Sequence, residues 1–392
     1  MTNNENKAGK PYGLYLAAID PYIERVIPSP KEKVIAGRNM VEWGDNNAFP
    51  NYLLNLTQEA PTLRSVILGT ADFICGNGIT LPFGSPAAAE SVEDGVLAKL
   101  DQMNVKGDTI YSQIRDIAID WLTYGGFALQ VIRSKTGAVV EVYYCDIRFL
   151  RSNKENTVFY YSEKWGKSGK RDALIYPAFM PISPAQWKTL DPQAQESHSA
   201  SILYVKSSHT QVYPLPPYCA ALKSCETERA IADYHLNAID NNFVASMLIN
   251  FNNGTPPDDM KKEIEQDVNE KFAGHKNAGR IMVAFSPDRA HGITLEQPKV
   301  EDFGSHYQAL EKNVRQQIFT AFRSSPVLFG IPTENNGFAA DNYQDAFRLY
   351  NRTVVKPIQT IIADAYDYIF GKAGFINITP FSLDEGGETT IQ

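Results

Sequence analysis

The sequence predicts an α+β chain in which long helices flank a small α/β insert. Three observations point to this class. Branched and aromatic residues on both sides of a glycine turn at residues 135–137 are typical of a β-hairpin. Residues 218–253 contain neither proline nor glycine and carry apolar residues at helical spacing, as do two later stretches. A strand, a charged helix and a second strand are expected between the first two long helices.

The N-terminal half is expected to form one α+β domain over residues 1 to about 215. Scattered prolines and glycines in residues 1–50 indicate extended arms and short strands. Helical spacing recurs in Asn51–Ile74, where Pro61 divides two short helices, and in Ser112–Thr123, which two glycines close. The predicted strands are the segments FALQVIRS and AVVEVYYCDIRFLR, Thr157–Glu163 and Ala200–Lys206.

A long apolar stripe begins the C-terminal half. Ala232, Leu236, Ile239, Phe243 and Met247 are spaced as on one face of a helix of about 30 residues. A helix of that length needs a packing partner along its length. The α/β insert follows, and its predicted elements are a strand at Met247–Phe251, a charged helix at Asp258–Phe272 and a strand at Arg280–Phe285.

Two further long helices are predicted. The first covers about Val300–Phe322 and carries Val314 and Ile318 in its stripe. A loop with two prolines follows, and the last helix contains Pro357, which should kink it because proline lacks an amide hydrogen and clashes with the preceding turn.

Composition limits the functions that the chain can have. The formal charge of -8 and the pI of about 5.4 argue against a protein that grips nucleic acid through a basic face. No run approaches the roughly 20 apolar residues of a membrane helix, and the first residues lack the apolar core of a signal peptide, so we expect no membrane contact and synthesis in a cytoplasm. The scattered Cys75, Cys145, Cys219 and Cys225 read as small core residues, and no metal or other cofactor is expected.

Enzyme motifs are missing from the sequence. It has no phosphate-binding GxxxxGK[ST] loop, no GxSxG elbow and no HExxH pair. Glu301, Asp302 and Glu311 have the spacing of solvated helix residues rather than of paired catalytic carboxylates. We therefore expect no catalytic residue, and a hydrolase is the weakest of the classes considered.

Several strings of the sequence resemble the portal proteins of tailed bacteriophages. They are YGGFALQVIRSKTGAVVEVYYCDIRFLR, FNNGTPPDDMKKEIEQDVNEKFAGHKNAGRIMVAF, QQIFTAFRSSPVLFGI with its asparagine-rich continuation, WGDNNAFPNYLLNL and ICGNGI. The order of long helix, insert, long helix, loop and kinked helix is similar too. The resemblance covers about residues 40–372, and two of the strings look like portals of phages from Bacteroidetes-type hosts.

The resemblance implies a division of the chain into portal regions. They are a wing at residues 1–215, stem helices at residues 216–247 and 300–323, a clip at residues 248–299, a tunnel loop at residues 324–341, a kinked C-terminal wing helix at residues 342–374 and a short tail at residues 375–392. It leaves a substantial helical crown in doubt. The stem-packing residues would be Leu236, Ile239, Phe243, Met247, Val314 and Ile318.

The resemblance also implies partners. Portals form closed rings, usually dodecamers, at one capsid vertex, where double-stranded DNA passes in during packaging and out during ejection. The clip would dock the terminase large subunit and then the head–tail adaptor, and the wing would contact the major capsid protein or scaffold. The protein would be found in the virion, and in the host cytoplasm during assembly.

Two features of the predicted clip, its charged residues and its strands, each have two competing interpretations. The clip residues Asp258, Asp259, Lys261, Lys262 and Glu265 suit either a docking surface or a solvated helix face. The clip strands either pair with a neighbouring subunit or form a self-contained subdomain.

The loop residues are small and mostly uncharged, which suits transient DNA contact, although a plain surface loop has the same composition. They are Thr333, Glu334, Asn335, Asn336 and Gly337. Val327, Leu328, Phe329 and Ile331 should pack the base of this loop. Arg348, Arg352 and Lys356 lie on one predicted helix face, which is either a salt-bridged exterior or a DNA-facing stripe.

The competing class is a non-catalytic intracellular binding module, monomeric or dimeric, in which the long helices form a bundle without a DNA channel. Its oligomer size would distinguish it from a portal ring.

Overall fold

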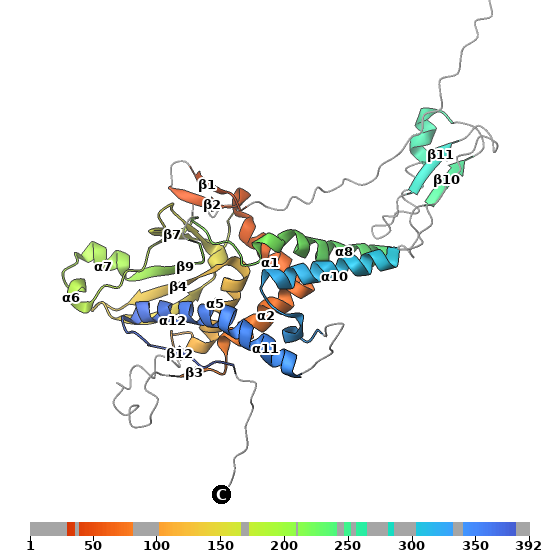
Figure 1. Cartoon of the computed structure of the whole chain (residues 1–392). Helices are drawn as coiled ribbons and strands as arrows, with labels where there is room; N and C mark the ends of the chain where they lie inside the picture. The colour runs from red at the N-terminus through yellow and green to blue at the C-terminus, as the bar shows by residue number, and fades with distance from the viewer. Residues whose placement is uncertain are drawn as a thin grey trace, which may run out of the picture. The chain divides into compact units, whose positions relative to one another are not determined.

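A computed structural model gives the fold of the chain, and it describes residues 30–35, 39–80, 102–165, 172–208, 211–240, 247–251, 256–264, 281–285, 303–331 and 340–381. The chain divides into two compact units. The larger comprises Ile27–Glu228 and Glu311–Gln392, and Arg229–Leu310 belongs to the smaller. Helices α8 (Leu222–Asp240) and α10 (Phe303–Ala321), both labelled in Figure 1, each contain residues of both units.

The larger unit contains sheets of five, three and two strands. The five-stranded sheet is antiparallel in the order β1-β2-β6-β7-β8. Its strands are β1 (Glu32–Ile35), β2 (Met40–Trp43), β6 (Leu150–Ser152), β7 (Val158–Tyr161) and β8 (Leu174–Pro177). The others are β5-β4-β9, made of β5 (Val139–Cys145), β4 (Gly126–Arg133) and β9 (Ala200–Lys206), and the pair β12 (Asn377–Ile378) and β3 (Ile79–Thr80). The predicted hairpin is the antiparallel pair β4 and β5, and β9 has the predicted bounds.

Proline, capping and glycine residues mark where several helices of the larger unit begin and end. Pro61 lies in the first turn of α2, because a proline there loses no helical hydrogen bond. The Thr109 side chain accepts from the Ser112 amide at the start of α5, and Gly125 ends that helix in a left-handed conformation. The helices are α1 (Phe49–Glu59), α2 (Pro61–Cys75), α5 (Ile110–Tyr124), α6 (Pro184–Trp187), α7 (Pro192–His198), α11 (Ala340–Tyr350) and α12 (Lys356–Phe370). Short turns of 3-10 helix are η1 (Asp45–Asn47), η2 (Ile147–Phe149), η3 (Cys219–Ala221) and η5 (Pro326–Phe329).

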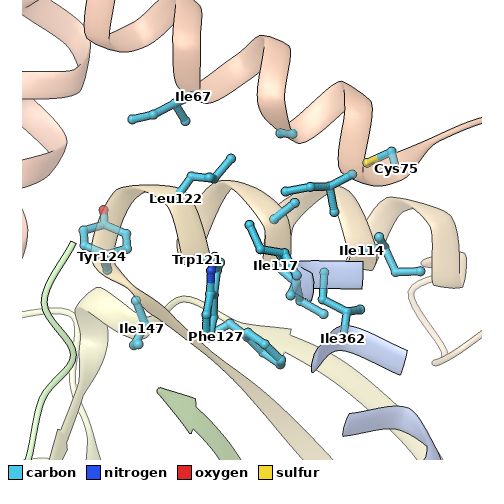
Figure 2. Close-up of a cluster of buried hydrophobic side chains, with 14 of the residues drawn as sticks. Ile67, Cys75, Ile114, Ile117, Trp121, Leu122, Tyr124, Phe127, Ile147 and Ile362 are labelled. Atoms are coloured by element: carbon cyan, nitrogen blue, oxygen red, sulfur yellow. The ribbon is translucent and has the colours of Figure 1, made fainter. Parts of the chain in front are cut away.

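The main core lies around α5. Figure 2 shows Leu122 on α5 with Ile67 of α2 on one side, and Trp121 directed toward Phe127 of β4, with ring centroids 6.2 Å apart. Ile362 of α12 belongs to the same cluster of buried side chains. Helix α5 is therefore apolar on both sides, and burial of these side chains from water is the main force that holds the larger unit together.

A buried arginine anchors the proline-rich segment at residues 177–192. The Arg133 guanidinium donates to the backbone oxygens of Gly137, Met180 and Ile182 at 2.9, 2.7 and 3.2 Å. It also lies 4.9 Å from the ring centroid of Phe179. Gly137 has a φ of +87°, and a Cβ there would lie 2.4 Å from the Trp187 ring, so the hairpin turn requires glycine for two reasons.

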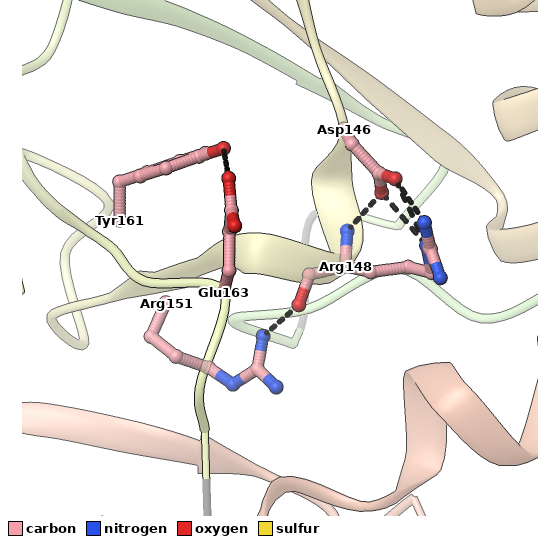
Figure 3. Close-up of polar contacts among 5 residues, drawn as sticks. All are labelled: Asp146, Arg148, Arg151, Tyr161 and Glu163. Atoms are coloured by element: carbon pink, nitrogen blue, oxygen red, sulfur yellow. Dashed lines mark hydrogen bonds and ion pairs between the residues drawn. The ribbon is translucent and has the colours of Figure 1, made fainter. Parts of the chain in front are cut away.

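The string WGDNN forms a turn at the end of β2 in which Trp43, Gly44 and Asn47 are buried. Asn46 and Asn47 adopt positive φ angles of 54° and 60°, a conformation that asparagine tolerates better than most residues. The Asn47 side-chain oxygen accepts from the Trp43 amide at 3.0 Å and from Arg151 Nε at 2.6 Å. Arg151 also donates to the backbone oxygen of Arg148 (Figure 3), and burial lowers its pKa to about 10. The motif is therefore structural.

The last long helix changes its winding in the middle. Helix α11 ends at Tyr350, residues Asn351–Val355 form a π-helical turn (η6), and α12 begins at Lys356. The Lys356 amide donates to the Asn351 carbonyl, and Pro357 then occupies the first turn of α12, where its missing amide costs no hydrogen bond. The sequence predicts a kink at Pro357, and the structure has a π-helical turn directly before the helix that contains it.

The smaller unit contains two parallel strands, β10 (Met247–Phe251) and β11 (Ile281–Phe285), which pair from Met247 with Ile281 to Phe251 with Phe285. Residues 258–264 are helical. Among the residues that the structure describes, no helix has the length and apolar character needed to cross a membrane.

Candidate channel-forming elements

Helices α8 and α10 contact each other in the larger unit. The Ser224 hydroxyl donates to the Gln317 side chain at 2.6 Å, and Val314 and Ile318 are buried in the main core. Glu228 of α8 caps a distant helix: its carboxylate accepts from the backbone amide of Thr62 at 3.2 Å, where Ala60 at the N-cap of α2 offers no side-chain acceptor. These contacts fix the first part of α8, up to Glu228, within the larger unit.

Aromatic rings join the two helices in the smaller unit. The Tyr234 and Tyr307 rings stack with centroids 4.9 Å apart, and His235 meets the Tyr307 ring edge-on at 5.7 Å. A hydrogen bond with Tyr234 raises the pKa of Tyr307. His235 is exposed. No group of histidine, cysteine, aspartate or glutamate side chains in the described part of the chain has the arrangement of a metal site.

The predicted stem-packing residues differ in their burial and in the elements to which they belong. Val314 and Ile318 are buried, whereas Leu236 is 60% exposed. Ile239 lies in α8 and Phe243 lies outside the described residues. Met247 was assigned to the helical stripe, and this was wrong: α8 ends at Asp240, and Met247 is the first residue of β10. Phe243 and Met247 are four residues apart, which fits one face of a helix and also one face of a strand. The spacing alone therefore did not distinguish a helix from a strand at Met247.

The predicted clip has one charged helical surface. Asp258 and Lys261 form an ion pair at 2.8 Å, and this hydrogen bond lowers the pKa of Asp258. Asp259 and Lys262 are exposed, and Glu265 lies outside the described residues. Sequence reasoning missed Met260, which is 54% exposed among these charges. The sequence signal that could have found it is a methionine with two charged residues on either side.

The first residues of the predicted tunnel loop at residues 324–341 pack into the larger unit, and Pro326–Phe329 form a 3-10 turn there. Val327 and Leu328 are buried, and the Phe329 ring lies 5.7 Å from that of Phe319. Phe329 also fills the space beside Gly69, where a Cβ would lie 2.8 Å from its ring. The loop residues themselves, Thr333 to Gly337, lie outside the described residues.

The basic residues of the last helix are exposed. Arg348 pairs with Asp345 at 3.6 Å, and both side chains are largely solvated. Arg352 and Lys356 are exposed as well. The prediction that Arg348, Arg352 and Lys356 lie on one face assumed a regular α-helix. The π-helical turn at Asn351–Val355 changes the rotation between these residues.

The cysteines are core residues. Cys75, Cys145 and Cys225 are buried and Cys219 is half-buried, and all four are free thiols. Burial raises the pKa of Cys75 to about 11 and that of Cys225 to about 12, so both thiols are protonated at neutral pH.

Comparison with known proteins identifies the family. The model of the phage portal protein family matches residues 87–382, which is more than half of the chain. A search of curated proteins finds no match. Among solved structures, a chain in the virion of a native gene transfer agent particle has a TM-score of 0.52 at 17% identity, covering 84% of this chain and 83% of that one.

Two other solved structures are similar. A chain in the neck of an empty gene transfer agent particle, computed with C6 symmetry, has a TM-score of 0.50 at 18% identity and covers 85% of this chain and 84% of that one. An HK97-family phage portal protein from Corynebacterium diphtheriae has a TM-score of 0.45 at 13% identity and covers 83% of this chain and 90% of that one. The family match also disfavours the alternative of a helical binding module without a channel. The chain belongs to the phage portal protein family.

Proposed function

We propose that this chain assembles into the ring-shaped portal of a phage capsid, through which double-stranded DNA is packaged and ejected. The observation that carries the proposal is the family match over residues 87–382, together with a fold in which α8 and α10 connect the larger unit to a small α/β unit. The acidic composition suits a channel, because tight binding of phosphates by a basic wall would slow DNA.

The small unit supports assembly with a neighbouring copy. Parallel sheets are normally covered on both sides, and a pair of strands is marginally stable alone. The described strands of this unit, β10 and β11, form such a pair. Strand addition by the next subunit would supply further backbone hydrogen bonds, and we prefer it to a self-contained subdomain. The ring would be a dodecamer held in the virion by the major capsid protein or scaffold, after assembly in the host cytoplasm.

Native mass spectrometry with negative-stain imaging tests the ring. Each chain has a mass of 43.7 kDa, so a ring of about a dozen copies should have a mass on the order of half a megadalton and a central hole. A discrete dimer that persists when scaffold and capsid protein are added would contradict the proposal, because a closed portal ring has no dimeric end state.

The charged helix at residues 258–264 is the proposed docking surface for the terminase large subunit and, after packaging, for the head–tail adaptor. Asp259 and Lys262 are exposed, and Met260 is an exposed apolar side chain of the same helical segment. Charges at the rim of an interface mainly set the association rate and its salt dependence, which suits a surface that must exchange partners.

Reversing the charge of Asp259 should weaken terminase binding. We expect Asp259→Lys to lower the association rate several-fold at low salt and much less at high salt, because ions screen rim charges. Biolayer interferometry with the purified terminase large subunit measures this rate. Asp345→Lys is the matched control, since Asp345 is exposed and lies on α11 in the larger unit. Equal binding by both variants would favour the solvated-face interpretation.

A further inference from the structure

Helix α8 carries a short apolar stripe that is exposed in the part of the chain that the structure describes. We define the stripe by Ala232 and Leu236, which are four residues apart and therefore lie above one another on the helix surface. Both are exposed, and Leu236 is 60% exposed. The sequence continues the spacing with Ile239 inside the same helix.

The stripe lies away from the helix that α8 contacts in the smaller unit. Tyr234 stacks on Tyr307 of α10. Each residue turns an α-helix by about 100°, so Ala232 and Leu236, two positions before and after Tyr234, each lie roughly 160–200° from it around the axis. Within the described residues, α8 thus has one side that packs on α10 and an apolar side that faces solvent.

The adjoining helix also exposes one leucine in this unit. Leu310 of α10 is 41% exposed and lies one turn after Tyr307. Both helices of the smaller unit therefore expose apolar side chains, Leu236 on α8 and Leu310 on α10. A ring needs this arrangement, because each head-to-tail contact joins two unlike surfaces of the same chain.

We propose that the stripe of one copy packs against α10 of the next copy at Leu310. This inference rests on the proposed ring. DNA is a poor occupant, because its phosphates offer a leucine no apolar surface to bury against. Asp233 lies beside the stripe and supplies the polar rim that subunit interfaces commonly have. The contact is small, so it would add to the pairing of the clip strands rather than replace it.

A single substitution tests the contact. Leu236→Asp should raise the concentration at which half of the rings dissociate by at least about tenfold, since it places a charge in a desolvated contact. Mass photometry over a dilution series measures that concentration. Circular dichroism and the melting temperature of the dissociated chain should match wild type, because Leu236 is exposed there.

Leu349→Asp is the matched control. Leu349 is 66% exposed and lies on α11 in the larger unit, so its variant should form rings like those of wild type. If Leu236→Asp rings dissociate like wild type, the inference fails while the proposed function stands. If the rings persist and only adaptor binding is lost, the stripe serves the adaptor and the inference fails too. A wild-type chain that never forms rings overturns both.

Covalent crosslinking tests the partner helix. A variant with both Leu236→Cys and Leu310→Cys, oxidised in the assembled ring, should give a ladder of covalent multimers on a non-reducing gel. Each single variant should give none, because the native cysteines are mostly buried. Intact rings without a ladder would show that Leu310 is not opposite the stripe.

Discussion

Gly125→Ala is expected to lower the free energy of unfolding of the larger unit by about 4 kcal/mol or more, or to prevent folding. Gly125 ends α5 at a φ of +87°, and a Cβ there would lie 2.0 Å from the backbone oxygen of Leu215. The positive φ alone costs roughly 1–2 kcal/mol for a residue with a side chain. The remainder comes from moving the Leu215 backbone away.

That backbone has little freedom to move. Two residues earlier, Tyr213 stacks on Trp43 with centroids 4.7 Å apart and donates to the Val41 carbonyl, and the Ser207 amide donates to the Gly125 carbonyl at 2.9 Å. The strain therefore cannot relax through one flexible side chain. Buried, close-packed contacts of this kind transmit a displacement to their neighbours.

Gly107→Ala separates the two costs. Gly107 has a φ of +82°, and a Cβ there would meet nothing within 4 Å. Its variant should lose only the roughly 1–2 kcal/mol of the backbone conformation. Urea denaturation followed by tryptophan fluorescence gives both values. Equal losses in the two variants would show that the approach of Leu215 is unimportant.

The sequence predicted local features of the fold well. The hairpin β4–β5 and the strand β9 could be predicted because each depends on its own alternation of residues and on a glycine turn. The division between α1 and α2 could be predicted because Pro61 is compatible only with the start of a helix. Such signals act over a few residues and need no knowledge of the rest of the molecule.

Long-range contacts were beyond a single sequence. The placement of Arg133 under residues 180–182 and of Glu228 at the start of α2 depends on segments far apart in the chain. The same holds for Gly125, whose pattern indicated the end of a helix but not the approach of Leu215.

The candidate site shows the same limit. The spacing of Val314 and Ile318 predicted that both would be packed, and both are buried in the core. The same spacing argument predicted packing for Leu236, which is 60% exposed in the single chain. Spacing identifies an apolar face but not which molecule covers it. Charges in the clip helix likewise identify a polar surface and leave its partner to be tested.

Asp120 should make the protein less stable as the pH rises, because it is a buried acid. It lies on α5, is 4% exposed, and one of its side-chain oxygens has no hydrogen-bond partner. Burial raises the pKa of Asp120 well above the usual value, and the charge of Asp146 raises it further. Three weaker effects lower this pKa in part: hydrogen bonds with Tyr144 and with the Ile147 backbone, and the charge of Arg148. Tyr124, another neighbour, is neutral at physiological pH like an ordinary tyrosine, and burial raises its pKa further.

The sign of the effect follows from proton binding. Between the unfolded pKa of about 3.9 and the raised folded pKa, the folded protein holds a proton on Asp120 that the unfolded chain has lost. The stabilisation is complete below about pH 4 and is lost as the pH rises through the folded pKa. Within that window, the free energy of unfolding should fall by up to about 1.4 kcal/mol for each pH unit.

Asp120→Asn should remove this slope, because the amide has nearly the shape of the protonated carboxyl and does not ionise. We expect the variant to equal wild type near pH 4 and to exceed it in stability as the pH rises, by up to about 1.4 kcal/mol for each pH unit of that window. Urea unfolding at a series of pH values measures both curves, and their difference cancels the other titrating groups, including Asp116, whose pKa burial also raises. Parallel curves would mean that Asp120 is ionised in the folded protein, with Arg148 rather than a proton neutralising its charge.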